Sequence, residues 1–372
     1  MRLIVTGGGT GGHIYPALEI AKEMVRLLPH AKVLFVGTGE GMESSIVPKE
    51  GIEFAVVRSA GVMGKSPAVA AKGLWKALTG LKDARRVLRE FRPDVVFGTG
   101  GYASGPVVMS AYALKIPRAI QEQNGVPGKT NLLLSRFCGR VFAAWEYSRQ
   151  FFPKPGNVVV TGNPVRRELL LSQGENGRDY YGIPEDVPVI IVLGGSRGAR
   201  TLCQVASEIQ RMGLGDAHMV LIAGKEYYKS AVGELSARED PRIDGARAGN
   251  IIIRPYEHNM AMAYGAADLV VCRAGGMTLS EITALGLPSV IVPSPNVAGN
   301  HQEHNARALL EAGAAHVVRE AADAVAKVAA DALRLLRDKE RLSAMREASL
   351  RLGRPTAAET ICRELIKMAK GR

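Results

Sequence analysis

The sequence predicts an α/β protein made of two Rossmann-like domains, each with a parallel sheet. The chain has 372 residues, which is enough for two domains that each bury a core. Apolar runs rich in Val and Ile recur along it, and each ends in Gly or Asn and is followed by a helical pattern. Continuous apolar strands that alternate with helices indicate parallel sheets covered on both faces. The series of runs begins again near residue 187, which indicates a second domain of the same kind.

The expected strands follow one another in two series. The first series lies at 2–9, 32–39, 94–101, 118–125, 140–145 and 157–164, and the second at 187–196, 217–224, 249–256, 267–276 and 287–295. Between them, GENGRDYYGIPEDVP (174–188) is polar and carries Gly and Pro, so we interpret it as a linker. The tail from Asp323 to Arg372 has a helical pattern throughout, with a break at 353–355.

Composition limits the classes of function. The formal net charge is +12, which suits nucleic acid, an anionic membrane face or phosphorylated substrates. Only 5% of the residues are aromatic and no RNA- or DNA-binding motif is present, so we expect no nucleic-acid partner. No apolar run approaches the ~18 residues that span a bilayer, and the N-terminal stretch is too short for a signal peptide. The four cysteines are widely separated, which indicates reduced structural thiols in a cytoplasm.

Glycine-rich turns follow four of the expected strands, two in each series. They are GGGTGGH (7–13), GTGGYASGP (98–106), LGGSRGAR (193–200) and RAGGMTLSE (273–281). Such turns expose backbone N–H groups at helix N-termini, where the partial positive charge favours an anion. A diphosphate fits, because its charge rises when a sugar leaves it and fixed N–H donors would stabilise that leaving group. Ligands bind beyond the carboxyl ends of parallel strands, so the four turns predict one cleft between the domains.

Other interpretations of the glycines fit less well. G-x-G-x-x-G occurs at 7–12, but the second strand ends in Gly37 and Thr38, not in the carboxylate with which dinucleotide enzymes hold a ribose. A P-loop is excluded because no Gly-Lys-Ser/Thr follows any of the turns. The glycines could merely allow tight strand-to-helix turns. This explanation is plausible for one turn but poor for four. No D-x-D occurs in the chain, so we expect no metal and no cofactor, with Arg166 or Arg197 assisting the helix termini at the diphosphate.

Seven longer motifs occur in order between residue 2 and about residue 318. They are GGGTGGHIYPALEIAKEM, GTGGYASGP, QEQNGVPGKTN, TGNPVR, LGGSRGAR, CRAGGMTLSEITALGLPSVIVP and GNHQEHNARALLEAGAA. Together they resemble the MurG family of GT-B glycosyltransferases, whose two Rossmann-like domains face each other across a cleft. The resemblance implies an inverting reaction of peptidoglycan synthesis. In it, the MurNAc 4-hydroxyl of lipid I attacks the anomeric carbon of UDP-GlcNAc, which gives lipid II and UDP.

The resemblance also implies where the domains begin and end and what each of them binds. Residues 1–163 would form an N-terminal domain that binds the acceptor and associates with the membrane. Residues 164–353 would form a C-terminal domain that binds UDP-GlcNAc. The last helix, within 354–372, would pack back toward the N-terminal domain. After residue 320 the chain matches the family only in length and helical character.

The resemblance assigns residues to the sugar-nucleotide site by position in the motifs. They are Thr10, Gly11, Gly12, Asn124, Arg166 and Ser196, followed by Gly276, Met277, Thr278, Leu279, Ser280, Glu281 and Gln302. In the family's pattern, Glu281 would hold the ribose hydroxyls and Gln302 would bind the hydroxyls of the sugar. His301 and Glu257 depart from the common pattern, and Glu257 would contact the nucleotide through its backbone only.

Several of these residues have simpler explanations. His13 is the first candidate for the general base that deprotonates the acceptor hydroxyl, and Glu122 is the second. His13 could instead cap or pack against the helix that it begins. Ser280 and Glu281 could be a first-turn pair that the helix dipole favours.

Two other functions are compatible with the predicted fold. UDP-GlcNAc 2-epimerases also place two such domains around a UDP-sugar, although GTGGYASGP and QEQNGVPGKTN favour the transferase. A sensor or scaffold at the membrane surface would bind UDP-GlcNAc without turning it over. Zinc at His301-x-x-His304 is disfavoured because no third ligand is evident.

The stretch KSPAVAAKGLWKALTGLKDARRVLREF (65–91) predicts where the positive charge meets a membrane. Ser66 and Pro67 favour a helix start, so we expect a helix from there to about Glu90. Its core face would consist of Ala70, Leu74, Ala77, Leu78, Leu81, Ala84 and Leu88. A second face, the basic face, consists of Lys72, Trp75, Lys82 and Arg86, with Lys65 and Lys76 close by.

The basic face has two interpretations. It could lie on the anionic inner leaflet, which predicts a peripheral protein on the cytoplasmic side of the cell membrane. It could also be an ordinary solvated face, with its tryptophan turned sideways into the core.

Overall fold

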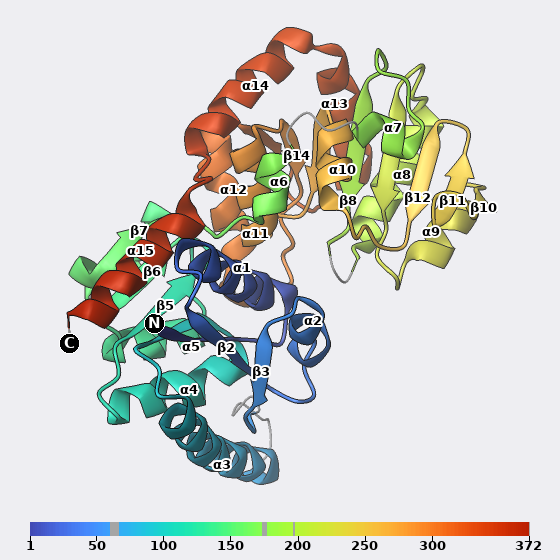
Figure 1. The fold of residues 1–372 in the computed structure, drawn as a ribbon. Helices are drawn as coiled ribbons and strands as arrows, with labels where there is room; N and C mark the ends of the chain where they lie inside the picture. Colours follow the sequence, from blue (N-terminus) through green and yellow to red (C-terminus); the bar gives the residue numbers. More distant parts are fainter. Residues whose placement is uncertain (60–66, 173–176, 196–197, 372) are drawn as a thin grey trace. The chain divides into compact units, whose positions relative to one another are not determined.

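The protein divides into two compact units, which are described separately (Figure 1). The N-terminal unit comprises Met1–Val165 and Arg354–Arg372, and the C-terminal unit comprises Arg166–Gly353. The structure is a computed structural model and describes the chain except residues 60–66, 173–176, 196–197 and 372. For residues 67–78 it describes the backbone only. Each unit has its own sheet with helices on both faces, as the predicted fold class requires.

The N-terminal unit is built on a seven-stranded sheet in which all neighbouring strands are parallel. In spatial order the strands are β3 (Glu53–Val56), β2 (Lys32–Gly37), β1 (Arg2–Gly7), β4 (Val95–Gly100), β5 (Arg118–Glu122), β6 (Arg140–Ala143) and β7 (Val158–Val160). The helices are α1 (Gly11–Leu27), α2 (Glu43–Lys49), α3 (Pro67–Phe91), α4 (Gly101–Ala113), α5 (Lys129–Leu134) and α15 (Ala357–Lys370). The strand order reverses between β1 and β4, which is where open sheets of this kind bind ligands.

Alternate residues of β1 face opposite sides of this sheet. Leu3 and Val5 belong to an apolar cluster with residues of α1 and with Leu365 of α15. Ile4 belongs to the cluster on the other face, which includes Leu88 of α3 and residues of α4. This alternation is the period of a strand buried on both faces. The last helix of the chain, α15, therefore helps to close the core of the N-terminal unit.

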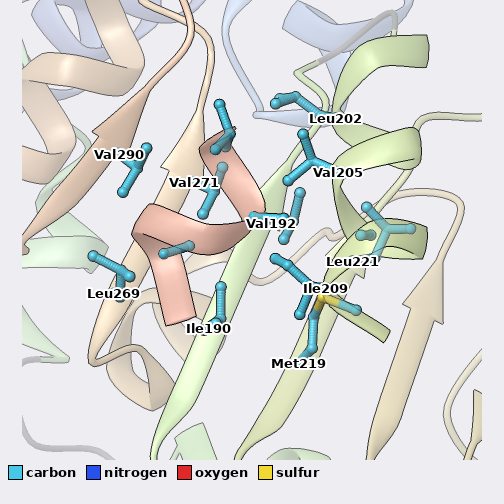
Figure 2. Close-up of a cluster of buried hydrophobic side chains, with 14 of the residues drawn as sticks. Ile190, Val192, Leu202, Val205, Ile209, Met219, Leu221, Leu269, Val271 and Val290 are labelled. Carbon is cyan, nitrogen blue, oxygen red and sulfur yellow. The ribbon is translucent and has the colours of Figure 1, made fainter. Parts of the chain in front are cut away.

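The C-terminal unit contains an eight-stranded sheet. In spatial order the strands are β10 (Arg238–Asp240), β11 (Gly245–Ala248), β12 (Ile251–Arg254), β9 (His218–Ile222), β8 (Val189–Leu193), β13 (Leu269–Cys272), β14 (Ser289–Ile291) and β15 (Ala315–Val317). The helices are α6 (Arg167–Leu171), α7 (Gly177–Tyr181), α8 (Arg200–Met212), α9 (Tyr228–Glu234), α10 (Met260–Ala266), α11 (Gly276–Leu285), α12 (His301–Glu311), α13 (Ala324–Arg337) and α14 (Lys339–Leu352). Figure 2 shows the core on one face, where Val192 and Leu221 of the central strands lie against Val205 of α8.

The second sheet is parallel, as predicted, except at one edge. β11 runs antiparallel to β12, and β10 runs antiparallel to β11. Only Gly249 and Asn250 separate β11 from β12, and Gly249 has φ +59°. A parallel connection needs a dozen or more residues, so a two-residue connection makes a hairpin. β3 and β15 were also missed, because each is short and contains a charged or polar residue, Glu53 or His316, so it forms no continuous apolar run.

The interpretation of 174–188 as a linker was also wrong. Gly177–Tyr181 form α7, which packs against α10 within the C-terminal unit (Figure 1). A Cβ at Gly177 would lie 2.2 Å from the carbonyl oxygen of Met262, so the two helices are in backbone contact. Tyr181 is buried. The division between the units falls instead between Val165 and Arg166.

Helix α3 covers the stretch that was predicted to be a helix. Ala84 and Leu88 are buried, and Lys82 and Arg86 are exposed, as the predicted faces require. The side chains of the remaining residues of the basic face, and Ser66, lie outside the part of the structure that is described. Among the described residues, no helix is both long enough and apolar enough to cross a membrane.

Candidate active site

The first two glycine-rich turns pack directly on each other in the N-terminal unit. A Cβ at Gly7 would lie 2.1 Å from the Thr99 hydroxyl oxygen and 2.7 Å from the carbonyl oxygen of His13. Gly101 has φ +76°, and a Cβ there would lie 2.2 Å from the carbonyl oxygen of Gly8. The turns after β1 and β4 therefore require glycine because their backbones touch. This contact places the start of α1 beside the end of β4.

Thr10, Gly11 and Gly12 form the N-terminus of α1. Thr10 is the N-cap residue, with extended backbone, and its carbonyl oxygen accepts hydrogen bonds from the N–H groups of His13 and Ile14. Thr10 and Gly12 are exposed, and Gly11 is buried. The first N–H groups of this 17-residue helix, together with its dipole, favour an anion at this end.

A buried carboxylate that the sequence analysis missed holds the first turn. Glu43 of α2 accepts hydrogen bonds from the N–H groups of Gly9 and Thr38, both at 3.1 Å, and from the Thr38 hydroxyl at 2.6 Å. Burial alone would raise the pKa of Glu43, but these hydrogen bonds outweigh burial and hold the pKa below its ordinary value. A Cβ at Gly8 or Gly41 would overlap the carboxylate. The glycines that precede Glu43 in the sequence were the one feature that could have indicated a close approach of the backbone to this carboxylate.

His13 is oriented by two oxygen atoms. Its Nδ1 lies 2.9 Å from the carbonyl oxygen of Thr99 and 3.2 Å from Oε1 of Gln123. Because both neighbours are acceptors, Nδ1 carries the proton of the neutral ring and Nε2 carries the lone pair. An imidazole held in this tautomer can take a proton at Nε2, as a general base must.

The contacts of Glu122 speak against its role as the alternative base. Its Oε1 accepts hydrogen bonds from the backbone N–H and the side-chain amide of Asn124, at 3.0 and 3.2 Å. Its Oε2 accepts from the N–H of Gly128 at 3.0 Å and from Nδ2 of Asn131 at 2.9 Å. These four donors occupy the acceptor positions that a carboxylate offers. Glu122 therefore fixes the loop after β5 and positions Asn124.

A polar network surrounds His13 and was not predicted. Gln123 donates to the carbonyl oxygen of Thr99 at 2.8 Å, and Asn163 donates to the carbonyl oxygen of Gln123 at 3.1 Å. Asn131 donates to the carbonyl oxygen of Gln121 at 3.0 Å. These side chains are buried and hold one another within the unit, while Oδ1 of Asn131 has no hydrogen-bond partner among the residues that the structure describes. The available signal was the run of amide and acid residues in QEQN and TGNP, directly after apolar strands.

In the C-terminal unit, the turn between β13 and α11 presents a second helix N-terminus. Gly276, Met277, Thr278 and Leu279 form the first turn of α11. Ser280 and Glu281 lie in the second turn, so the interpretation of these two as a first-turn pair was wrong. The Ser280 hydroxyl donates to the carbonyl oxygen of Gly276 at 3.0 Å.

Glu281 is joined to Arg166 and Tyr264. Nε and one terminal nitrogen of Arg166 donate to Oε1 of Glu281 at 3.2 and 3.1 Å, and the Tyr264 hydroxyl donates to Oε2 at 2.9 Å. Burial by itself would lower the pKa of Arg166, but the charge of Glu281 outweighs it and raises that pKa. Burial, reinforced by Glu281, raises the pKa of Tyr264 well above its ordinary value, so its hydroxyl stays a donor. Two residues predicted for the nucleotide thus meet, and Tyr264, which was not predicted, orients them.

Gln302, in the first turn of α12, is fixed through one end of its amide. Its Oε1 accepts a hydrogen bond from the N–H of Ser294 at 2.8 Å, which leaves the NH₂ end to donate to a ligand. Ser196 and Arg197 lie outside the described residues. No group of three or more His, Cys, Asp or Glu side chains that could hold a metal occurs in the part of the chain that the structure describes.

A hollow of about 440 Å³ lies beside Arg166, and we call it the α6–α10 hollow. Its lining residues are Arg166, Glu168, Leu169, Leu171, Ser172, His258, Asn259, Met260, Ala261 and Met262. Half of these residues are apolar and come from α6 and α10, and the other half carry polar or charged side chains, so the hollow offers both kinds of contact to a small molecule. The sequence analysis did not identify it, because its two walls lie about ninety residues apart in the chain.

Models of the N-terminal and C-terminal domains of glycosyltransferase family 28 match residues 3–143 and 189–361. The chain belongs to glycosyltransferase family 28. A relative from Caldanaerobacter subterraneus subsp. tengcongensis is 42% identical, covering 97% of this chain and 98% of its own. A relative from Symbiobacterium thermophilum is 43% identical, covering 100% and 97%. Both are named UDP-N-acetylglucosamine--N-acetylmuramyl-(pentapeptide) pyrophosphoryl-undecaprenol N-acetylglucosamine transferase.

A comparison with solved structures supports this family membership. The crystal structure of MurG from Acinetobacter baumannii matches with a TM-score of 0.74 at 26% identity, covering 98% of this chain and 99% of that one. The predicted resemblance to the MurG family is thereby confirmed. A UDP-GlcNAc 2-epimerase from Neisseria meningitidis, solved with UDP-GlcNAc, matches with a TM-score of 0.70 but only 16% identity. The epimerase therefore shares the fold and supports no statement about activity.

Proposed function

We propose that this protein transfers N-acetylglucosamine from UDP-GlcNAc to lipid I, with release of UDP. The hydroxyl at C4 of MurNAc attacks the anomeric carbon, the bond to the diphosphate breaks, and the product is lipid II with an inverted, β-linked sugar. The observation that carries the proposal is full-length identity of 42–43% to transferases of this name. The orientation of His13 adds a base in the required tautomer.

We assign donor binding to the C-terminal unit. The diphosphate lies at the N-terminus of α11, where the N–H groups of the first turn and the helix dipole stabilise the charge that UDP gains on leaving. Glu281 accepts a hydrogen bond from a ribose hydroxyl, and the NH₂ of Gln302 donates to the sugar. Arg166 and Ser196 contact the phosphates or the adjoining ribose. This donor set needs no metal bridge.

The α6–α10 hollow takes the uracil base in this proposal. A base is planar, with apolar faces and a polar edge. The hollow offers Leu169 and Met260 for the faces and the backbone of the loop before α10 for the edge. In this proposal the base lies beside Arg166, whose guanidinium donates to the carboxylate of Glu281 that receives the ribose.

The N-terminal unit supplies the acceptor side of the reaction. Nε2 of His13 takes the proton from the attacking hydroxyl, while Nδ1 stays bonded to the carbonyl oxygen of Thr99. Thr10, Gly11 and Gly12 present N–H groups to an anionic part of a substrate. Asn124, held by Glu122, contributes a side-chain amide.

The acceptor carries a lipid, so we place the protein on the cytoplasmic surface of the cell membrane. The basic face of α3 lies against anionic headgroups, with Lys82 and Arg86 exposed on it. A lipid-linked acceptor stays in the bilayer, and a protein held at the bilayer surface meets it there. No nucleic acid takes part.

The test is an assay of UDP release from UDP-GlcNAc with a short-chain analogue of lipid I. We expect UDP release that depends on the acceptor, together with a product that contains both sugars. A 2-epimerase would instead yield an epimerised sugar or its nucleotide without any acceptor. A sensor would bind UDP-GlcNAc and release no UDP under either condition.

A further inference from the structure

A buried polar network lies behind the α6–α10 hollow and takes no part in the proposed contacts with substrate. Glu257, in the loop between β12 and α10, is 3% exposed. Its Oε2 accepts a hydrogen bond from the Tyr181 hydroxyl at 2.6 Å and one from Arg254 at 2.6 Å. Its Oε1 accepts from the N–H of Asn259 at 2.8 Å. One carboxylate therefore joins three segments, namely α7, the end of β12 and the loop before α10.

The network is connected to the hollow through the backbone. Asn259, whose N–H is held by Glu257, lines the hollow, as does His258 beside it. Glu257, Tyr181 and Arg254 do not line the hollow themselves. Their interactions therefore act on a ligand only through the position of the loop that forms one wall.

Breaking this network costs free energy, because its members are buried and would be left without hydrogen-bond partners. Burial, reinforced by the bond to Glu257, raises the pKa of Tyr181, so its hydroxyl remains a donor. Arg254 is also buried and donates to Glu257 and to the hydroxyl of Tyr180. If the carboxylate becomes an amide, its NH₂ faces one of these donors and the loop must move to relieve the conflict.

We propose that Glu257 is a positioning residue for nucleotide recognition, holding the loop before α10 in the shape that accepts the uracil base. This inference rests on the proposed function, because it takes the α6–α10 hollow as the site of the base. Tyr181 supports Glu257 in this task. The side chain of Glu257 thus sets both the affinity for uridine nucleotides and the preference for them over other bases, although that side chain does not itself touch them.

The test measures binding of UDP to the intact protein by calorimetry, and the kinetics of transfer to a soluble lipid I analogue. For Glu257→Gln we expect the Kd of UDP and the KM of UDP-GlcNAc to rise about tenfold, with kcat within about twofold of wild type. Tyr181→Phe should raise both by about threefold, because it removes one of the three donors. The preference for UDP over ADP should fall in both variants.

Matched controls come from the surface of the same unit. The Tyr228 hydroxyl donates to the carboxylate of Glu239 at 2.8 Å, as Tyr181 does to Glu257, but Glu239 is exposed and Tyr228 is only half-buried. Tyr228→Phe and Glu239→Gln remove the same kinds of group, and we expect UDP affinity and base preference to stay at the wild-type values.

The outcomes separate the inference from the proposed function. If wild type binds UDP and folded Glu257→Gln and Tyr181→Phe bind it equally well with unchanged base preference, the inference fails. A lowered unfolding temperature with unchanged UDP affinity also overturns it, since that is the behaviour of a purely structural network. Tyr181→Phe keeps the shape of the side chain, so it decides the question if Glu257→Gln does not fold. Failure of wild type to bind UDP would count against the proposed function instead.

Discussion

Arg166 donates two hydrogen bonds to a single carboxylate oxygen of Glu281, at 3.2 and 3.1 Å. The resemblance to the family assigns both residues to the nucleotide, and the ion pair shows that they do not act independently. Glu281 keeps the guanidinium in place and offsets part of its charge, while the Tyr264 hydroxyl occupies the other oxygen. Three donors leave room for one more on the carboxylate, which is where a ribose hydroxyl would bind.

The first prediction concerns this carboxylate. Glu281→Gln should raise the KM for UDP-GlcNAc at least about tenfold, because a charge-assisted hydrogen bond to the ribose is worth ~1.5–3 kcal/mol. Steady-state kinetics at saturating acceptor measure it. Glu208→Gln is the control, because Glu208 pairs with Arg211 on the surface of the same unit. An unchanged KM in a folded Glu281→Gln protein would refute the ribose role.

The second prediction concerns metal. We expect transfer to continue in excess chelator, because helix termini and Arg166 hold the diphosphate in the proposed site. Divalent cations can still stimulate the rate by screening the substrates. The measurement is the initial rate of UDP release with and without chelator. A complete loss of activity that added metal restores would contradict this account.

The third prediction concerns the base. His13→Gln should lower kcat by about 10²–10⁴-fold, the range that general base catalysis contributes. Binding of UDP should stay at the wild-type value, because His13 belongs to the N-terminal unit, whereas Arg166 and Glu281, which are proposed to bind the phosphates and the ribose, belong to the C-terminal unit. His30→Gln, an exposed histidine of the same unit, is the matched control. A kcat within a factor of about three of wild type would assign the base elsewhere.

Local features of the fold could be predicted from the sequence, whereas contacts between distant residues could not. The turn after β1 and the extent of α3 could be predicted, because glycine spacing and helical periodicity are patterns among residues close together in the sequence. The hairpin at Gly249 escaped detection because β11, the first of its two strands, is short and only partly apolar. The pairing of Arg166 with Glu281 joins residues 115 positions apart. No local pattern encodes such a contact, since it exists only once the sheet has brought α11 and the start of α6 together.

The same distinction applies to Glu43, whose role appears only in the folded state. Its hydrogen bonds to Gly9 and Thr38 come from two different turns. In the sequence, Glu43 is an acidic residue near several glycines, and this pattern alone does not predict which groups its carboxylate binds.

The fourth prediction follows from the lowered pKa of Glu43. A carboxyl whose pKa is lower in the folded state stabilises the fold above its unfolded pKa, which is near the ordinary value of 4.5, and this contribution is lost as pH falls through the folded value. Glu43→Gln should therefore lower the free energy of unfolding by about 1–3 kcal/mol at neutral pH, and the difference from wild type should shrink below about pH 4.5.

Chemical denaturation across this pH range measures the effect. Glu40→Gln changes an exposed carboxylate of the same loop, and we expect it to leave stability unchanged at every pH. A difference for Glu43→Gln that stays constant from neutral to acid pH would show that the carboxylate charge is not what holds the turn.

The last prediction concerns the membrane and begins from α3. Ala84 and Leu88 are buried while Lys82 and Arg86 are exposed, so the described end of the helix has one apolar face and one basic face. Continued at the same period, the basic face would contain Lys72 and a tryptophan one turn further on. On an anionic surface each basic group would contribute ~1 kcal/mol at low salt, and the tryptophan would enter the interface.

The variant Lys72→Glu/Trp75→Ala/Lys82→Glu tests this surface by sedimentation with anionic vesicles. Its binding should be weaker than that of wild type, and wild-type binding should itself fall in high salt, because the attraction is screened. Turnover of a short-chain, soluble acceptor should stay near the wild-type value, since none of the three substituted residues is among those assigned to chemistry. Lys225→Glu/Lys229→Glu reverses two exposed charges on the C-terminal unit and serves as the control. If the triple variant sediments with vesicles as well as wild type does, a different surface of the protein meets the membrane.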